Sequence, residues 1–181
     1  MKKILIITLI MLNFFTKINA GYDQLAHEFS FKGIEGELID LKSYEGKVIV
    51  VVNVASRCGF TYQYEDLQNL WSNYKDLNLV VIGVPSNNFK QEPGSNKDIK
   101  NFCETNFNIN FPMTEKVDVI GNNAHPFFKW AKENHGKSAI PKWNFHKIII
   151  SKNGKVADTF SSITKPSSKR FIDFIEKEIK N

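Results

Sequence analysis

Two nearly continuous apolar runs stand out from an otherwise mixed pattern of apolar and polar residues. Residues 48–54 and 79–84 have the length and β-branched composition of strands that are buried on both faces. Between them, over 67–74, leucine, tryptophan and tyrosine recur at spacings of three and four, which predicts an amphipathic helix. A strand, a helix and a second strand in this order indicate parallel strand pairing.

Hairpins are predicted on either side of this unit. An alternating segment over 28–41 is broken by glycines at 33 and 36, which is typical of two short strands joined by a turn. Over 145–160, two apolar runs are separated by Asn153-Gly154, a pair that favours a tight turn between antiparallel strands.

Three further helices are expected. Ser95 or Asn96 can cap a helix that places Ile99, Phe102 and Cys103 on one face. A second helix is predicted at about 126–134, with its aromatic residues in the core, and a third closes the chain with Ser167 as its cap.

This element order predicts an α/β chain with a central mixed β-sheet flanked by helices and an N-terminal β-hairpin. With a cysteine directly after the first central strand, the arrangement indicates a thioredoxin-like fold. At 181 residues and 42% hydrophobic, the chain is long enough for one domain with a full core.

The first twenty residues have a separate character. Lys2 and Lys3 precede an apolar stretch over 4–15, and the segment ends at Ala20. This pattern predicts a signal peptide over 1–20, cleaved after Ala20, and an exported domain over 21–181 that is periplasmic or secreted. An uncleaved anchor or an ordinary first strand is the alternative.

Removing that segment changes the charge argument. It holds three lysines and no acid, so the formal net charge of +5 becomes +2. The remaining basic residues are spread among acids, which argues against a nucleic-acid partner. The four histidines lack metal-ligand spacing, so no metal and no bound cofactor is expected, and His146 is expected at the surface.

Cys58 lies where the first central strand gives way to a helix. The N-terminus of a helix favours a thiolate, so Cys58 is a candidate for an accessible thiol of low pKa. A buried structural cysteine is the alternative. Thr61 occupies the position of the second cysteine of a dithiol oxidoreductase, which excludes C-x-x-C disulfide exchange and a thioredoxin-like copper chaperone.

A lone thiolate that is exported needs an acceptor, and a peroxide is one. The thiolate would attack a peroxide oxygen and become a sulfenic acid. Gln91, Trp143 and Asn144 are candidate donors to the departing oxygen, although each could equally be a structural polar residue.

Four segments, "NVASRCGFT", "NNFKQEPGS", "FPMTEKVDV" and "KWNFHK", closely resemble the glutathione peroxidase family in its cysteine-using branch. The similarity runs in order from about residue 29 to the C-terminus. It implies a thioredoxin fold and a catalytic tetrad made of Cys58, Gln91, Trp143 and Asn144. Cys58 would be the peroxidatic nucleophile, and the other three would donate hydrogen bonds to the thiolate and the departing oxygen.

The resemblance also gives Cys103 a role, since "NFCETNFNINFP" looks like the helix that carries the resolving cysteine in thioredoxin-dependent members. The sulfenic acid would condense with Cys103, and a thioredoxin-like protein or glutathione would reduce the product. The alternative is an inert core cysteine, because Cys103 falls on an apolar helical face. Local unfolding of a short helix would reconcile the two.

The chain departs from the family pattern at several places. Ser86 replaces a cysteine that many members carry, and the loop before Gln91 is one residue short at Lys90. The segment over 136–143 is short, which predicts a monomer with an open site that admits organic and lipid hydroperoxides as well as hydrogen peroxide. A redox sensor or relay, which passes oxidation to a partner protein through the same thiols, is the alternative function.

Overall fold

A computed structural model describes residues 22–181. The predicted signal peptide and its cleavage after Ala20 lie outside the described residues. No helix within 22–181 has the length and apolar character needed to cross a membrane.

The strands and helices of the described chain follow one another in the predicted order. The strands are β1 (Ser30–Lys32), β2 (Leu38–Asp40), β3 (Val48–Val54), β4 (Leu79–Pro85), β5 (Lys147–Ile150) and β6 (Val156–Phe160). The α-helices are α1 (Gln63–Tyr74), α2 (Asn96–Phe107), α3 (Pro126–His135) and α4 (Lys169–Lys180), and four short 3-10 helices cover Ala26–Glu28, Leu41–Tyr44, Lys75–Leu77 and Gly136–Ala139.

The central sheet has the strand order β4-β3-β5-β6, and β1 pairs with β2 in a separate hairpin. Strand β3 is parallel to β4 and antiparallel to β5, which is antiparallel to β6. The ends of β3, β4 and β6 and the start of β5 therefore share one edge of the sheet. We call the loops there, residues 55–62, 86–94, 140–146 and 161–168, the carboxyl edge.

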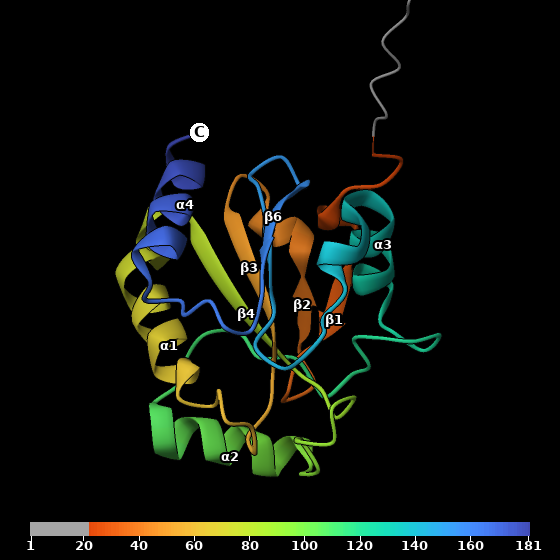
Figure 1. Cartoon of the computed structure of the whole chain (residues 1–181), viewed down its shortest axis with the longest axis vertical. Coiled ribbons are helices and arrows are strands. Elements are labelled where there is room, and N and C mark those ends of the chain that lie inside the picture. The colour runs from red at the N-terminus through yellow and green to blue at the C-terminus, as the bar shows by residue number, and fades with distance from the viewer. Residues whose placement is uncertain (1–21) are drawn as a thin grey trace, which may run out of the picture.

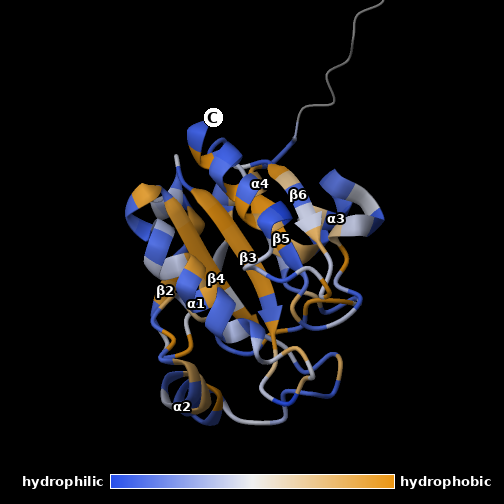
Figure 2. Ribbon diagram, turned by 60° about the vertical axis from the view of Figure 1, so that its left-hand side comes forward, coloured by the Kyte–Doolittle hydropathy of each residue, from blue (hydrophilic) through white to orange (hydrophobic). Residues whose placement is uncertain are grey.

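Both faces of the sheet are covered. Figure 1 shows α1 and α4 on one side and α3 with the hairpin on the other, while α2 lies across one end. Alternate residues of β3 supply the two cores: Val50 and Val52 pack with the side that includes Phe171 of α4, and Val51 packs with Phe127 of α3. The central strands β3 and β4 are accordingly apolar along most of their length (Figure 2).

The mixed sheet, both hairpins and the four helices are confirmed. The aromatic residues of α3 are buried as predicted, namely Phe127, Phe128 and Trp130. Two helix starts are wrong. Helix α1 begins at Gln63 rather than at Cys58, because a turn intervenes, and α4 is preceded by Ser168 rather than Ser167. The Ser168 hydroxyl donates to the Lys165 carbonyl instead of capping the helix.

Candidate active site

Cys58 lies in a tight turn at the carboxyl edge, between β3 and α1. Thr61 closes this turn: its hydroxyl oxygen accepts from the Cys58 N–H at 3.1 Å and lies 2.7 Å from the Cys58 carbonyl and 3.0 Å from that of Ala55. The residue that replaces a second cysteine therefore has a structural function, since it fixes the backbone that carries the thiol.

The Cys58 thiol is held inside this turn. The residue is buried, at 8% exposed, so the expectation of an accessible thiol is wrong. The Phe60 N–H donates to Cys58 Sγ at 3.4 Å. A backbone donor of the turn thus stands where the helix N-terminus was expected.

Gln91 and Asn144 meet at the carboxyl edge, although 53 positions separate them in sequence. The Asn144 Nδ2 donates to Gln91 Oε1 at 2.8 Å, which leaves the Nε2 group of Gln91 as a donor. Asn144 is fully buried, and its Oδ1 has no hydrogen-bond partner. The Gln91 carbonyl also accepts from the Arg57 N–H at 3.0 Å, so the Gln91 loop is bonded to the residue before Cys58.

Trp143 is the exposed member of the candidate set. It is 41% exposed, its ring packs against Phe89 with 5.4 Å between centroids, and its carbonyl accepts from Asn53 Nδ2 at 3.2 Å. Within the described chain, no hydrogen bond joins the Cys58 sulfur to the side chains of Gln91, Trp143 or Asn144. The structure therefore joins Gln91 and Asn144 by a side-chain hydrogen bond and leaves the Trp143 side chain partly exposed.

Backbone strain is concentrated beside the candidate residues. Lys90, which precedes Gln91, has φ 59°, and Phe145, which follows Asn144, has φ 63°. This left-handed conformation costs about 1–2 kcal/mol for a residue with a side chain. The other two such residues in the described chain are asparagines, which tolerate it, at the ends of helices. Strain of this kind gathers at functional sites.

Asn53 is a site residue that the sequence reasoning missed. It is fully buried as the next-to-last residue of the apolar strand β3, and its carbonyl oxygen accepts from Phe145 N–H while its Oδ1 accepts from His146 N–H at 3.1 Å. A polar residue within a buried apolar run must be paired, and this was the available signal. Asn53 fixes the segment that carries Trp143 and Asn144.

The expected surface position of His146 is wrong. His146 directly precedes β5, and its backbone N–H is bonded to the buried side chain of Asn53. The residue is only 7% exposed, and its Nε2 is buried without a hydrogen-bond partner. Burial, with smaller contributions from Lys147 and Lys142, lowers the pKa of His146 to about 4.

We predict that His146 makes the protein acid-sensitive. The folded pKa is about 4 and the unfolded value is about 6.5, so the unfolded chain binds the extra proton and stability falls as the pH drops from 6.5 towards 4. His146→Leu should reduce the loss of unfolding free energy between pH 7 and pH 4.5 by about 2 kcal/mol, measured by urea unfolding. An unchanged pH dependence in this variant would contradict the assignment.

Lys147 is a second buried titratable residue that the sequence does not predict. Its ammonium donates to Gln63 Oε1 and to the Thr164 carbonyl, and Gln63 Nε2 donates to the Ser162 carbonyl at 2.7 Å. Burial lowers the pKa of Lys147 to about 7. This network attaches the first turn of α1, close to Cys58, to the loop that follows β6.

Cys103 lies on the inner face of α2. It is 1% exposed, and burial raises the pKa of its thiol to about 12. Cys58 and Cys103 are both free thiols and belong to one core cluster, on the side of the sheet covered by α1 and α4. The predicted burial of Cys103 is confirmed, while its resolving role stays a prediction.

Comparison with known proteins gives a consistent result. The family model described as glutathione peroxidase matches residues 26–132. A hydroperoxy fatty acid reductase of Synechocystis sp. is 45% identical over 158 residues, which cover 82% of this chain and 94% of that protein. The glutathione peroxidase-like peroxiredoxin 2 of Saccharomyces cerevisiae is 44% identical over 78% of this chain and 90% of its own length.

Solved structures agree with these relatives. The crystal structure of Trgpx in apo form matches with a TM-score of 0.70 and 34% identity, and covers 88% of this chain and 97% of that one. Together with the single thiol at the carboxyl edge, these findings define an enzyme of the thiol peroxidase class. The chain belongs to the glutathione peroxidase family, in its cysteine-containing form.

Proposed function

We propose that Cys58 is the peroxidatic residue of this enzyme. Its thiolate attacks one oxygen of a hydroperoxide, the O–O bond breaks, and the other oxygen leaves as water or an alcohol after taking a proton. Cys58 then carries a sulfenic acid. The observation that supports this most is the Gln91–Asn144 hydrogen bond, which joins two loops at the sheet edge where the thiol lies.

The neighbouring polar groups have separate roles in this proposal. The Phe60 N–H stabilises the thiolate from within the turn. The free Nε2 of Gln91 and the Trp143 indole N–H donate to the departing oxygen, and Asn144 orients Gln91 through the bond to its Oε1. Donors held in place by strained backbone need little rearrangement during the reaction.

Cys103 is proposed to resolve the sulfenic acid. Its thiolate attacks the Cys58 sulfur, a disulfide forms, and the hydroxyl group leaves as water. In the folded helix the thiol stays protonated, because its pKa is about 12. Opening of α2 would expose it to solvent and return its pKa to about 8.5, the ordinary value for cysteine.

A dithiol protein of the thioredoxin type is the proposed reductant, with glutathione as the competing donor. One dithiol protein, which becomes a disulfide, or two glutathione molecules, which become glutathione disulfide, would pass two electrons to the Cys58–Cys103 disulfide and restore both thiols. A screen of reductants in which the disulfide is followed by mass spectrometry tests this choice. Rapid reduction of the disulfide by glutathione alone would contradict the proposal of a thioredoxin-type reductant and identify glutathione as the donor.

We further propose that hydroperoxides of fatty acids and lipids are good substrates. At the carboxyl edge the exposed charged residues are all cations, Arg57, Lys90, Lys142 and Lys165, and the one acid of these loops is buried. The edge also exposes apolar surface at Tyr62, Trp143 and Ile163. Cations around an apolar surface suit a carboxylate on a long chain, and the Synechocystis relative is named for hydroperoxy fatty acids.

Charge selectivity provides the test. We expect kcat/KM for a fatty acid hydroperoxide to exceed that for its methyl ester by about tenfold at low salt, and the ratio to fall towards 1 in Lys142→Gln or at high salt. Lys155→Gln, on the turn between β5 and β6 at the opposite edge, serves as the matched control and should keep the ratio. Equal rates for acid and ester in the wild type would contradict the substrate proposal.

Export and a monomeric state are also proposed. The supporting pattern for export is the charged start, short apolar stretch and terminal Ala20 of residues 1–20. The mass of the protein recovered from cells tests cleavage after Ala20, since the mature domain would begin at residue 21. Light scattering during size-exclusion chromatography tests the monomer.

A further inference from the structure

Glu92, directly after Gln91, carries a buried carboxylate that the proposed reaction does not use. The residue is 1% exposed, and burial raises its pKa. Its Oε2 accepts from Ser56 N–H at 2.7 Å and from Ser56 Oγ at 2.9 Å. A carboxylate is costly to bury unless strong hydrogen bonds offset the lost hydration, so its retention beside the site needs a reason.

These two hydrogen bonds join the loops that carry Cys58 and Gln91. Ser56 binds the Glu92 carboxylate, and the next residue, Arg57, donates its N–H to the Gln91 carbonyl at 3.0 Å. Two consecutive residues before Cys58 are therefore bonded to Gln91 and its neighbour. The separation between the thiol turn and the Gln91 amide depends directly on these contacts.

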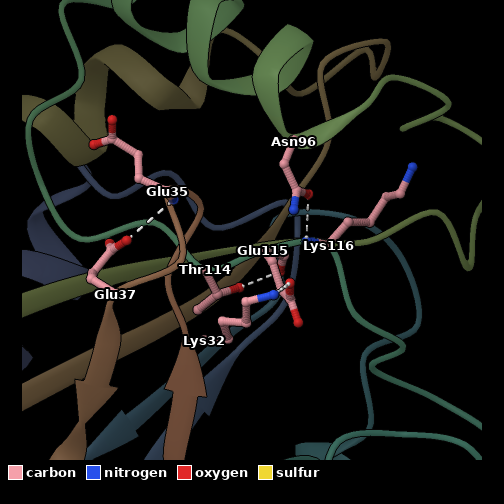
Figure 3. A network of polar contacts seen from close by, with 7 residues as sticks. All are labelled: Lys32, Glu35, Glu37, Asn96, Thr114, Glu115 and Lys116. Atoms are coloured by element: carbon pink, nitrogen blue, oxygen red, sulfur yellow. Dashed lines mark hydrogen bonds and ion pairs between the residues drawn. The ribbon is translucent and has the colours of Figure 1, made fainter.

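The Gln91 loop is anchored on its other side as well. The Glu92 N–H donates to Asn87 Oδ1 at 3.0 Å, and Lys116 Nζ donates to the carbonyls of Glu92 and Gly94 at 3.3 and 2.7 Å. Lys116 is itself fixed, because its N–H donates to Asn96 Oδ1 at 3.0 Å at the start of α2 (Figure 3). These hydrogen bonds fix the Gln91 loop, and the two Ser56 bonds fix the Cys58 turn relative to that loop.

A cavity of about 180 Å³ lies beside the two loops, lined by Ser56, Arg57, Glu92 and residues of α2 that include Ile99 and Phe102. Hydrogen bonds join the loops at this point: two run from Ser56 to the Glu92 carboxylate, and one runs from Arg57 N–H to the Gln91 carbonyl. Loss of the carboxylate would remove two of these three bonds.

We infer that Glu92 is a positioning residue that sets the distance between the Cys58 turn and Gln91 by accepting both Ser56 hydrogen bonds. The inference rests on the proposed role of Cys58. An oxygen acceptor is what the geometry requires, and a carboxamide oxygen at the same place would also accept both bonds. Glutamine should therefore substitute for glutamate, and alanine should not.

The test is single-turnover oxidation of Cys58 by hydrogen peroxide in a Cys103→Ser background. We expect Glu92→Ala to lower the second-order rate constant about 10- to 100-fold, as misplacement by about 1 Å does. Glu92→Gln should stay within about threefold of the parent. Should Glu92→Ala fail to fold, Ser56→Ala removes one of the two bonds and should slow the reaction about threefold to tenfold.

A second serine–carboxylate pair supplies the control. Asp98 Oδ2 accepts from Ser95 N–H at 3.0 Å and lies 2.7 Å from Ser95 Oγ, on an exposed turn of α2. Asp98→Ala should keep the parent rate constant. A folded Glu92→Ala with the parent rate constant would overturn the inference, and so would Glu92→Gln as slow as Glu92→Ala. Failure of peroxide to oxidise Cys58 in the parent would instead overturn the proposed function.

Discussion

Cys58→Ser is expected to lower the rate of peroxide reduction by roughly 10³-fold or more, equivalent to about 4 kcal/mol of activation free energy. A serine hydroxyl stays protonated at neutral pH, so the Phe60 N–H and the Gln91 amide would have no anionic nucleophile to assist. The measurement is peroxide consumption with a thioredoxin-type reducing system. The variant should fold normally, because serine is slightly smaller than cysteine and fits the same turn.

Cys103→Ser provides the internal control for this experiment. It retains the reactive turn, so its first oxidation by peroxide should proceed at the wild-type rate. Full turnover in Cys58→Ser would remove the proposed function altogether, and equal single-turnover loss in both variants would point to a general disturbance of the fold.

Cys103→Ser is expected to lower steady-state turnover with a thioredoxin-type reductant by about 100-fold, because no intramolecular disulfide can form. The sulfenic acid on Cys58 should accumulate and react with a sulfenic-acid trapping reagent, and mass spectrometry should show no disulfide between positions 58 and 103. Burial of Cys103 at 1% exposure makes opening of α2 a condition of the wild-type step.

An unchanged steady-state rate in Cys103→Ser would show that a reductant attacks the sulfenic acid directly. In that case Cys103 is a core residue, and only its resolving role is lost. Mixed disulfides with one dominant partner other than a thioredoxin, trapped in cells with this variant, would support the relay function instead.

The elements that the sequence predicts well are those in which burial repeats with a clear period. The strand over 48–54 and the apolar face of α2 follow directly from apolar spacing. The start of α1 was misplaced because Thr61 closes a turn through side-chain hydrogen bonds that no periodicity reveals. Local polar contacts of this kind compete with helix formation.

The candidate site was predictable in part. The resemblance to the family groups Gln91 with Asn144, whereas the hydrogen bond between their side chains is a finding of the structure. The burial of His146 and Lys147 could not be anticipated, since both residue types are mostly exposed. Their environment depends on Asn53 and Gln63, which are distant in sequence.

The depth of Cys103 in α2 has a consequence for survival of the enzyme at high oxidant levels. In the proposed cycle the sulfenic acid persists until α2 opens, and a second peroxide molecule arriving in that interval would convert it to a sulfinic acid, which thiols do not reduce. The dose of peroxide that inactivates the protein is then determined by how often one helix unfolds.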